Sequence, residues 1–304
     1  MVAVLSGVVL SCVGGRYRVF TGEQILEATL RGRMKQTGEA QVLVGDRVAL
    51  AMHGAEEATI ERVHERDSVL RRRSPGRARG TRPVAANVDQ VVVVGSTRRP
   101  DWNPYLIDRF TAVAEANHVA AIVVVNKVDL EDSAEAFGDA YRRAGYAVLA
   151  TSTKTGVGIA ELRERLTSHV SLFAGPTGVG KSSLLNALVP GLTLRTAAVS
   201  HRSGAGRHTT VSAEMHSIGH GGFVVDTPGL RDVGLWGLDP AEVGEAFPEV
   251  APHRPDCRFD NCRHRGEPGC AVRGAVERGL VARTRYESYL RLLEEAEAAA
   301  RPWG

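Results

Sequence analysis

The stretch Gly175-Pro-Thr-Gly-Val-Gly-Lys-Ser182 decides the fold, because it has the spacing G-x4-G-K-[S/T] of a phosphate-binding loop. An apolar run typical of a strand precedes it, and an apolar-periodic run typical of a helix follows it. In such a loop, backbone N–H groups at a helix N-terminus converge on phosphate oxygens, the lysine contacts the β- and γ-phosphates, and the serine ligates Mg²⁺. The predicted nucleotide-binding loop comprises Gly175, Pro176, Thr177, Gly178, Val179, Gly180, Lys181, Ser182 and Ser183.

A second motif, Asn126-Lys127-Val128-Asp129, ends an apolar run and precedes the phosphate loop in the chain. The Asp129 carboxylate can accept two hydrogen bonds, from the ring N–H and the exocyclic amine of guanine, and adenine offers no such pair of donors. The motif therefore predicts selection of GTP over ATP, although an ordinary Asn/Asp turn after a strand is the alternative. Ser152, Thr153 and Lys154 follow the next strand and can present backbone amides to the guanine O6.

Two later segments are expected to bind Mg²⁺ and the γ-phosphate. The sequence Asp226-Thr-Pro-Gly229 ends an apolar run, so the carboxylate can hold Mg²⁺ through water and Gly229 can offer its amide to the γ-phosphate. Residues 200–212 are rich in Gly, Ser, Arg and His, which is typical of a switch loop ordered by Mg²⁺ and the γ-phosphate. Thr209 or Thr210 is expected to supply a hydroxyl to Mg²⁺, and the sequence leaves the choice open.

The pattern of apolar runs predicts a multidomain α/β protein. Short Val/Leu/Thr-rich runs in the first 70 or so residues indicate a five-stranded β-barrel, for which an oligonucleotide-binding (OB) type fits and another small barrel is the alternative. From Val88, strands and helices alternate, which predicts a mostly parallel sheet covered on both faces. Residues 71–83 are rich in Arg, Gly and Pro and are expected to be a linker. The predicted domains are residues 1–78, 79–239 and 240–304.

The third predicted domain contains a cluster of metal-binding residue types and a final charged helix from about residue 282 to 300. Three cysteines and one histidine form a closed tetrahedral set suited to one structural Zn²⁺, and the absence of a C-x-x-C pair disfavours a redox role. His253 is an alternative ligand. The expected zinc ligands are Cys257, Cys262, His264 and Cys270, and Arg254, Arg258, Arg263 and Arg265 surround them.

Charge and hydropathy narrow the class of partner. The formal net charge is only +3, but Arg clusters near residues 62–82 and 254–265 favour a polyanionic partner, with a solvated Arg-rich surface as the alternative. Only four lysines occur, and three of them, Lys127, Lys154 and Lys181, lie in the nucleotide motifs. The apolar run at residues 1–13 lacks a preceding positive region, and no segment reaches the ~18 apolar residues of a membrane span, so we expect a cytoplasmic protein with no membrane partner.

The motif order resembles the circularly permuted GTPases, and within them the ribosome small-subunit-dependent GTPase A family. The resemblance covers nearly the whole chain: VGDRV at residues 44–48, then NKVD, STK, GPTGVGKSS, GRHTT, DTPG and the Cys/His cluster. It implies hydrolysis of GTP to GDP, stimulation by the 30S subunit and a role in late small-subunit maturation. GTP and GDP, the 30S subunit and 16S rRNA are therefore the expected partners of a monomeric protein that uses Mg²⁺ and one Zn²⁺.

Catalysis is the least defined step, because Leu230 follows DTPG where many GTPases carry a water-orienting Gln. The resemblance suggests His208 as the substitute, and a contact with RNA or ordering of the switch loop is its alternative role. The expected catalytic residues are His208, Lys181, Thr209 and Thr210. Gly178 stands where some potassium-activated GTPases carry Asn, so potassium stimulation is not expected.

Two rival functions follow from these gaps. One is a non-enzymatic RNA-binding factor that uses GTP as a structural ligand. The other is a permuted GTPase that serves another ribonucleoprotein or a membrane. Since DTPG leads directly into the zinc-binding segment, a further hypothesis is that nucleotide state moves that segment.

Overall fold

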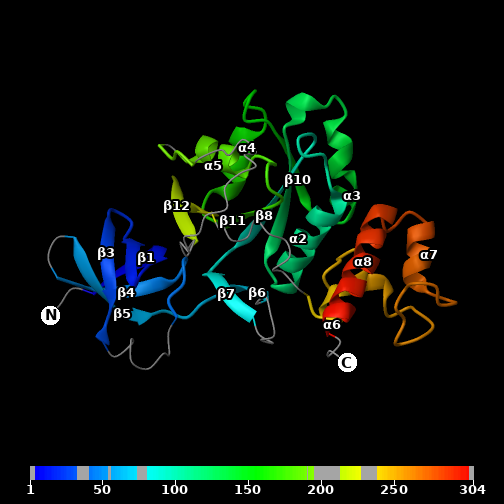
Figure 1. Cartoon of the computed structure of the whole chain (residues 1–304), viewed down its shortest axis with the longest axis horizontal. Coiled ribbons are helices and arrows are strands. Elements are labelled where there is room, and N and C mark those ends of the chain that lie inside the picture. The colour runs from blue at the N-terminus through cyan, green and yellow to red at the C-terminus, as the bar shows by residue number, and fades with distance from the viewer. Residues whose placement is uncertain are drawn as a thin grey trace, which may run out of the picture. The chain divides into compact units, whose positions relative to one another are not determined.

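The computed structural model describes residues 4–32, 41–53, 56–73, 81–189, 191–194, 213–226 and 238–300 (Figure 1). The chain divides into two compact units, and each combines segments that are distant in sequence. Unit 1 comprises Met1–Asp89, Leu166–Phe173 and His201–Leu230, and unit 2 comprises Gln90–Arg165, Ala174–Ser200 and Arg231–Gly304. Among the described helices, none is both long enough and apolar enough to cross a membrane.

Five strands of unit 1 close into a barrel. They are β1 (Val4–Val13), β2 (Arg16–Phe20), β3 (Ile25–Leu30), β4 (Arg47–Met52) and β5 (Glu57–Val63). Their order is β1-β2-β3-β5-β4, and β1 also pairs with β4, which closes the circle. Neighbouring strands run antiparallel except β3 and β5, which run parallel. A partly open five-stranded Greek-key barrel is the OB architecture, so the predicted barrel is confirmed.

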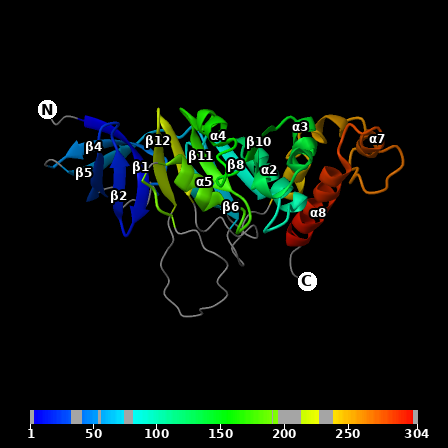
Figure 2. The same cartoon turned by 90° about the horizontal axis from the view of Figure 1, so that it is seen from above.

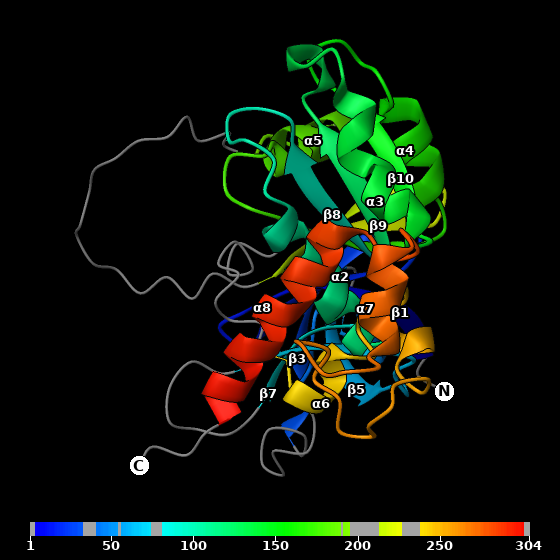
Figure 3. The same cartoon turned by 90° about the vertical axis from the view of Figure 1, so that its right-hand side faces the viewer.

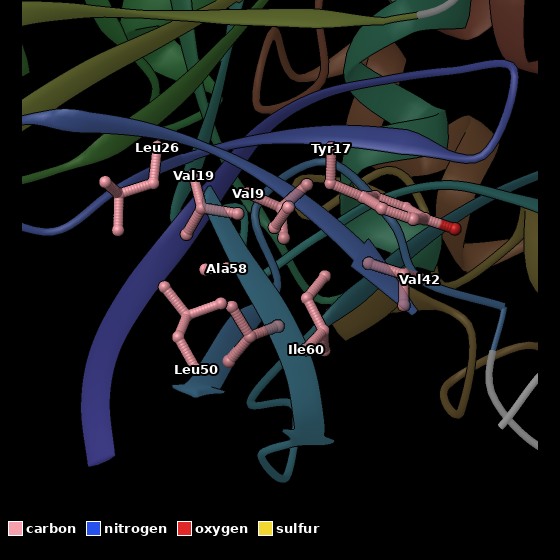
Figure 4. Close-up of a cluster of buried hydrophobic side chains, with 10 residues drawn as sticks. Val9, Tyr17, Val19, Leu26, Val42, Leu50, Ala58 and Ile60 are labelled. Carbon is pink, nitrogen blue, oxygen red and sulfur yellow. The ribbon is translucent and has the colours of Figure 1, made fainter. Parts of the chain in front are cut away.

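The barrel is held together by its alternating strands. Burial alternates along β2 and β3, which places one side chain in two inside the barrel. Figure 4 shows Val19, Leu26, Leu50 and Ile60 meeting in this interior, where each is fully buried. Full burial of such a side chain contributes about 1.5–3 kcal/mol, so the barrel interior is a substantial core of its own.

Three further strands of unit 1 extend the barrel sheet: β11 (Val170–Ala174), β12 (Glu214–Gly219) and β13 (Gly222–Asp226). β11 and β13 run parallel, and β12 forms an antiparallel hairpin with β13. β12 also pairs with β1, through Ser11 opposite Glu214, and the two strands lie side by side in Figure 2. Arg18 forms an ion pair with Glu214 at 3.4 Å, and the rings of Phe20 and Phe223 meet edge to face at 5.8 Å. The barrel is therefore continuous with the hairpin that ends at Asp226.

The expected linker at residues 71–83 is partly wrong. Its ends belong to two paired antiparallel strands, β6 (Val69–Arg73) and β7 (Thr81–Ala86), and residues 74–80 lie outside the described part of the chain. The Arg-rich composition gave no sign of these strands, because backbone pairing between β6 and β7 stabilises them. Leu70 and Ala85 are their fully buried apolar residues.

Unit 2 contains the parallel strands β8 (Gln90–Ser96), β9 (Ala120–Asn126) and β10 (Ala147–Thr151) in the order β10-β9-β8. Every residue of β8 is buried, as expected for a strand covered on both faces. α2 (Pro104–Ala116) packs on β8 and β9, and it begins with the Asn103 side chain accepting from the Leu106 amide at 3.2 Å. The remaining elements here are η1 (Val128–Leu130), η2 (Ala134–Gly138), α3 (Asp139–Arg143), α4 (Ile159–Leu166) and α5 (Lys181–Leu188).

The C-terminal part of unit 2 consists of α6 (Pro240–Val243), η5 (Ala251–His253), α7 (Ala271–Glu277) and α8 (Arg283–Ala300). α8 lies against α2 (Figure 3). Arg285 of α8 is only 1% exposed, and its guanidinium donates to Asp108 of α2 at 2.9 Å and to Glu249 at 2.6 and 3.0 Å. The same guanidinium lies over three aromatic rings, at 4.8 Å from Phe247, 5.3 Å from Tyr146 and 5.4 Å from Tyr141. A buried charge cluster therefore joins α8 to α2.

Candidate nucleotide-binding site and metal centre

The predicted phosphate loop lies between the end of β11 and the start of α5. Two of its glycines have no room for a side chain. A Cβ on Gly175 would lie 2.2 Å from the Val94 carbonyl oxygen, and a Cβ on Gly180 would lie 2.4 Å from the Asn126 Nδ2. Both glycines also have positive φ, +136° and +102°. The loop is therefore packed tightly against the ends of β8 and β9.

Lys181 lies over this loop at the first position of α5. Its ammonium donates to the carbonyl oxygens of Gly175 at 2.6 Å and Pro176 at 2.7 Å. The charge is thus held at the loop, where backbone amides and a helix N-terminus also favour an anion. Ser182 and Ser183 follow on the half-buried first turn of the same helix.

Asn126 joins the guanine motif to the phosphate loop. It is 1% exposed, its Nδ2 donates to the Val179 carbonyl at 2.8 Å, and its Oδ1 accepts from the Thr151 hydroxyl at 3.0 Å. The side chain therefore satisfies both ends of its amide between the phosphate loop and β10. Replacement by Asp would remove the donor to Val179, so this position requires an amide.

Lys127 takes a strained conformation that brings its side chain over the phosphate loop. Its φ is +59°, in the left-handed region that costs a non-glycine residue free energy. The ammonium donates to the Gly178 carbonyl at 2.7 Å and to the Arg99 carbonyl. Burial lowers the pKa of Lys127 from its ordinary value; the Asp129 charge opposes this shift and the Arg99 charge adds to it.

Asp129 is oriented by the segment after β10. One carboxylate oxygen accepts from the Ser152 hydroxyl at 2.6 Å, and the other lies 3.8 Å from the Lys154 ammonium. The Ser152 hydroxyl in turn accepts from the Thr155 amide at 3.2 Å, so the turn around it is hydrogen-bonded. The Asp129 side chain is 12% exposed and the Lys154 side chain 79% exposed. Val128 and Thr153 lie beside these groups in sequence, and Thr153 is exposed.

The structure thus brings the predicted phosphate loop, the NKVD motif and Ser152 to one place in unit 2. Asp226 ends β13 in unit 1 and is 9% exposed. His208, Thr209, Thr210, Gly229 and Leu230 lie outside the described residues. Sequence reasoning missed Thr97 and Arg99, which contact Lys127. Their only signal was a position just beyond the end of β8.

The four predicted metal ligands form one cluster in unit 2. The sulfur atoms of Cys257, Cys262 and Cys270 and a ring nitrogen of His264 all lie within 4.8 Å of one another. The Nδ1 atom of His264 is 3.5 Å from the sulfur of Cys257 and from that of Cys270. Tetrahedral zinc with Zn–S bonds of about 2.3 Å places its sulfurs ~3.8 Å apart, so this donor set fits one such ion. His253 does not belong to the cluster; its backbone carbonyl lies 3.9 Å from the Cys257 sulfur.

Hydrogen bonds shape the metal-binding loop independently of the ligands. Glu267 accepts from the backbone amides of Arg263 and Arg265 at 2.8 Å and of Gly266 at 3.0 Å. These bonds, that of Gly266 first, lower the pKa of Glu267 to about 2. His264 has a φ of +60° and is buried, with 2% of its surface exposed. Its backbone carbonyl accepts a hydrogen bond from the Tyr286 hydroxyl. The loop is therefore tied to α8.

The arginines around the cluster are less available than their number indicated. Arg254 pairs with Glu245, and Arg263 and Arg265 both pair with Glu297, the latter at 3.2 Å. Arg258 instead lies 5.5 Å from the ring of Phe259, which is 41% exposed. The sequence favoured a polyanionic partner for the Arg cluster at residues 254–265, but it did not show that carboxylates pair with three of these arginines.

Comparison with known proteins decides the family. A sequence model of the RsgA GTPase family matches residues 63–236, which is more than half of the chain. The chain belongs to the RsgA GTPase family. A second model, of the RsgA N-terminal domain, matches residues 6–60, which covers the barrel. The membership confirms the family resemblance and makes the chain a GTP hydrolase, which disfavours the non-enzymatic rival.

Two relatives named RsgA match this chain over nearly their full lengths. A protein of Gemmatimonas aurantiaca named small ribosomal subunit biogenesis GTPase RsgA is 50% identical over 304 residues, covering 97% of this chain and 98% of the relative. One of the same name from Moorella thermoacetica is 42% identical, covering 98% and 99%.

Two solved structures have the same fold as this chain. YjeQ from Thermotoga maritima superposes with a TM-score of 0.79 at 34% identity, covering 99% of this chain and all of the other. YloQ, described as a circularly permuted GTPase, superposes with a TM-score of 0.77 at 27% identity, covering 99% and 98%. The permuted GTPase fold predicted from the motif order is therefore confirmed.

Proposed function

We propose that this GTPase acts in biogenesis of the small ribosomal subunit, with the 30S subunit as its stimulating partner and 16S rRNA as the contacted polyanion. The observation that carries the proposal is the near full-length similarity to relatives named for that role, combined with the assembled guanine and phosphate motifs. The protein acts as a monomer in this proposal. Its predicted domains remain residues 1–78, 79–239 and 240–304.

In the proposed site, Asp129 accepts from the ring N–H and amine of guanine while Ser152 holds the carboxylate in place. Asn126 and Lys127 both donate to carbonyls of the phosphate loop, so they keep the base site and the phosphate loop at a fixed spacing. Backbone N–H groups of residues 175–183, except Pro176, which has none, and the Lys181 ammonium bind the phosphates. Because the NKVD motif and the phosphate loop are joined by hydrogen bonds, a shift of one would move the other away from its part of the nucleotide.

Hydrolysis in this proposal needs Mg²⁺, which neutralises charge on the β- and γ-phosphates when bound. Ser182, Asp226 and either Thr209 or Thr210 are the proposed Mg²⁺ ligands, and Gly229 offers its amide to the γ-phosphate. Lys181 stabilises the charge that develops in the transition state. His208 is the proposed residue that orients the attacking water.

The first test is phosphate release from GTP by the full chain, with and without purified 30S subunits. We expect 30S to stimulate release, and we expect Lys181→Ala to lower kcat/KM by about 10²–10³-fold, because an electrostatic contact with the transferred phosphoryl group is lost. Arg143→Ala, which removes an exposed cation of α3, serves as the matched control and should change the rate little. Absence of any 30S stimulation would contradict the proposed role while leaving the GTPase intact.

We further propose that Cys257, Cys262, His264 and Cys270 hold one structural Zn²⁺ that fixes the loop against α8. Cys262→Ala should lower zinc affinity by more than about a hundredfold, because loss even of an outer-shell partner commonly costs 10–100-fold. Cys12→Ala, which changes the cysteine of β1 outside the cluster, is the control and should retain the metal. Elemental analysis of both purified variants gives the answer: equal zinc content in the two would refute the ligand set.

A further inference from the structure

Thr97 is a buried residue that contacts the guanine motif from a distant part of the chain. It follows β8 directly, is 1% exposed, and lies 30 positions before Lys127. Its amide donates to the Asn126 carbonyl at 3.0 Å, which extends the pairing of β8 and β9 by one bond. Its hydroxyl donates to the Lys127 carbonyl at 2.7 Å. The side chain therefore adds a contact that the backbone pairing alone does not provide.

The Lys127 carbonyl is the pivot of the guanine motif. It accepts from the Thr97 hydroxyl and also from the Leu130 amide at 3.0 Å, the bond that closes the η1 turn containing Asp129. Both lone pairs of this oxygen are thus used. Because Lys127 holds a strained left-handed conformation, the surrounding bonds must over-determine it, and the Thr97 hydroxyl is one of them.

The residues after Thr97 also contact Lys127 and the turn that follows it. The Arg99 carbonyl accepts from the Lys127 ammonium, and the Arg98 guanidinium pairs with Glu131 at 2.7 Å. The Ser96 hydroxyl closes this segment by donating to the Pro100 carbonyl at 2.7 Å. The segment at residues 96–100 therefore contacts the backbone and the side chain of Lys127 as well as the far end of the turn.

We infer that Thr97 is a positioning residue for guanine recognition, whose hydroxyl fixes the Lys127 carbonyl and thereby the turn that directs Asp129 to the base. The inference rests on the proposed role of Asp129. An ordinary buried threonine that satisfies a carbonyl would stabilise the fold equally, but it would not alter the discrimination between bases.

Base discrimination is measured by comparing GDP with IDP, since inosine lacks the 2-amino group that Asp129 is proposed to bind. We expect Thr97→Val to weaken GDP binding about tenfold and IDP binding less, so that the ratio Kd(IDP)/Kd(GDP) falls by about threefold or more. Thr97→Ser keeps the hydroxyl and should retain the ratio of the natural protein. Thr97→Ala is made alongside, in case the valine variant does not fold.

Thr111→Val is the matched control, because Thr111 is also fully buried in unit 2 and its hydroxyl donates to the Asp108 carbonyl at 3.0 Å. It should lower thermal stability and leave the ratio unchanged. An unchanged ratio in the folded hydroxyl-free variant, or a reduced ratio in Thr97→Ser, would overturn the inference. Equal affinity of the natural protein for GDP and ADP would instead refute the base-reading role of Asp129 itself.

Discussion

Asp129→Asn is expected to lower the affinity for GTP about a thousandfold and to create affinity for XTP. The carboxylate can accept both donors of guanine, whereas an amide accepts one and donates one, which matches the ring N–H and 2-oxo group of xanthine. Sites built to hydrogen-bond a substrate discriminate against a mismatched one by a factor of about 10⁴. We expect a smaller loss of affinity here because the phosphate contacts are retained. Equilibrium binding of the two nucleotides to the full chain measures the exchange.

Asp132→Asn is the control for this prediction, because Asp132 is an exposed carboxylate three positions further along the chain. It should leave both affinities unchanged within about twofold, as surface substitutions usually do. If Asp129→Asn bound GTP as tightly as the natural protein, the NKVD motif would be an ordinary turn and not the base-reading element.

Arg285→Ala is expected to destabilise the fold by about 3–5 kcal/mol. The substitution leaves Asp108 and Glu249 buried without their cation, and removal of one partner from a buried ion pair costs that much in other proteins. The loss of the contacts between the guanidinium and three aromatic rings also lowers the stability of the folded state. Urea unfolding followed by circular dichroism gives the difference in unfolding free energy.

Arg283→Ala supplies the matched comparison, since it removes an exposed guanidinium from the same helix two residues earlier. We expect a change within about 0.5 kcal/mol for that variant. A loss below about 1 kcal/mol for Arg285→Ala would show that the buried cluster relaxes or admits water when its cation is removed.

The sequence predicted those elements whose signals are local. Strands β1 to β5 followed from short Val/Leu/Thr-rich runs. β9 followed from the apolar run that ends in the motif Asn126-Lys127-Val128-Asp129. The phosphate loop was predicted from eight consecutive residues. Its surroundings support that prediction, since any side chain at Gly175 or Gly180 would collide with β8 or Asn126.

Features that depend on distant partners could not be predicted. Arg285 lies in a helix that carries many charged residues, so its side chain is expected to be exposed. Its burial depends on Asp108, 177 positions earlier in the chain. The strand β12 was not expected, because its sequence Glu-Met-His-Ser-Ile-Gly has weak alternation and its pairing with β1 and β13 defines it. Tertiary pairing outweighs strand propensity in such segments.

One edge of β1 pairs with two strands, β4 and β12, and the ribosome synthesises β12 much later than β4. Its first half pairs with β4, and Ser11 pairs with Glu214 of β12. All five barrel strands lie within the first 63 residues, whereas Glu214 is 196 positions beyond Arg18. The barrel can therefore close early during translation, while the second half of that edge waits until β12 emerges.

During that interval the barrel presents unpaired backbone groups, which in other proteins recruit strands from neighbouring chains. Charge on the adjacent strand, at Arg16 and Arg18, opposes such pairing between identical chains. When the hairpin of β12 and β13 pairs with β1, Arg18 forms an ion pair with Glu214. Arg18 therefore places a charge beside this edge of β1, and Glu214 pairs with that charge in the folded protein.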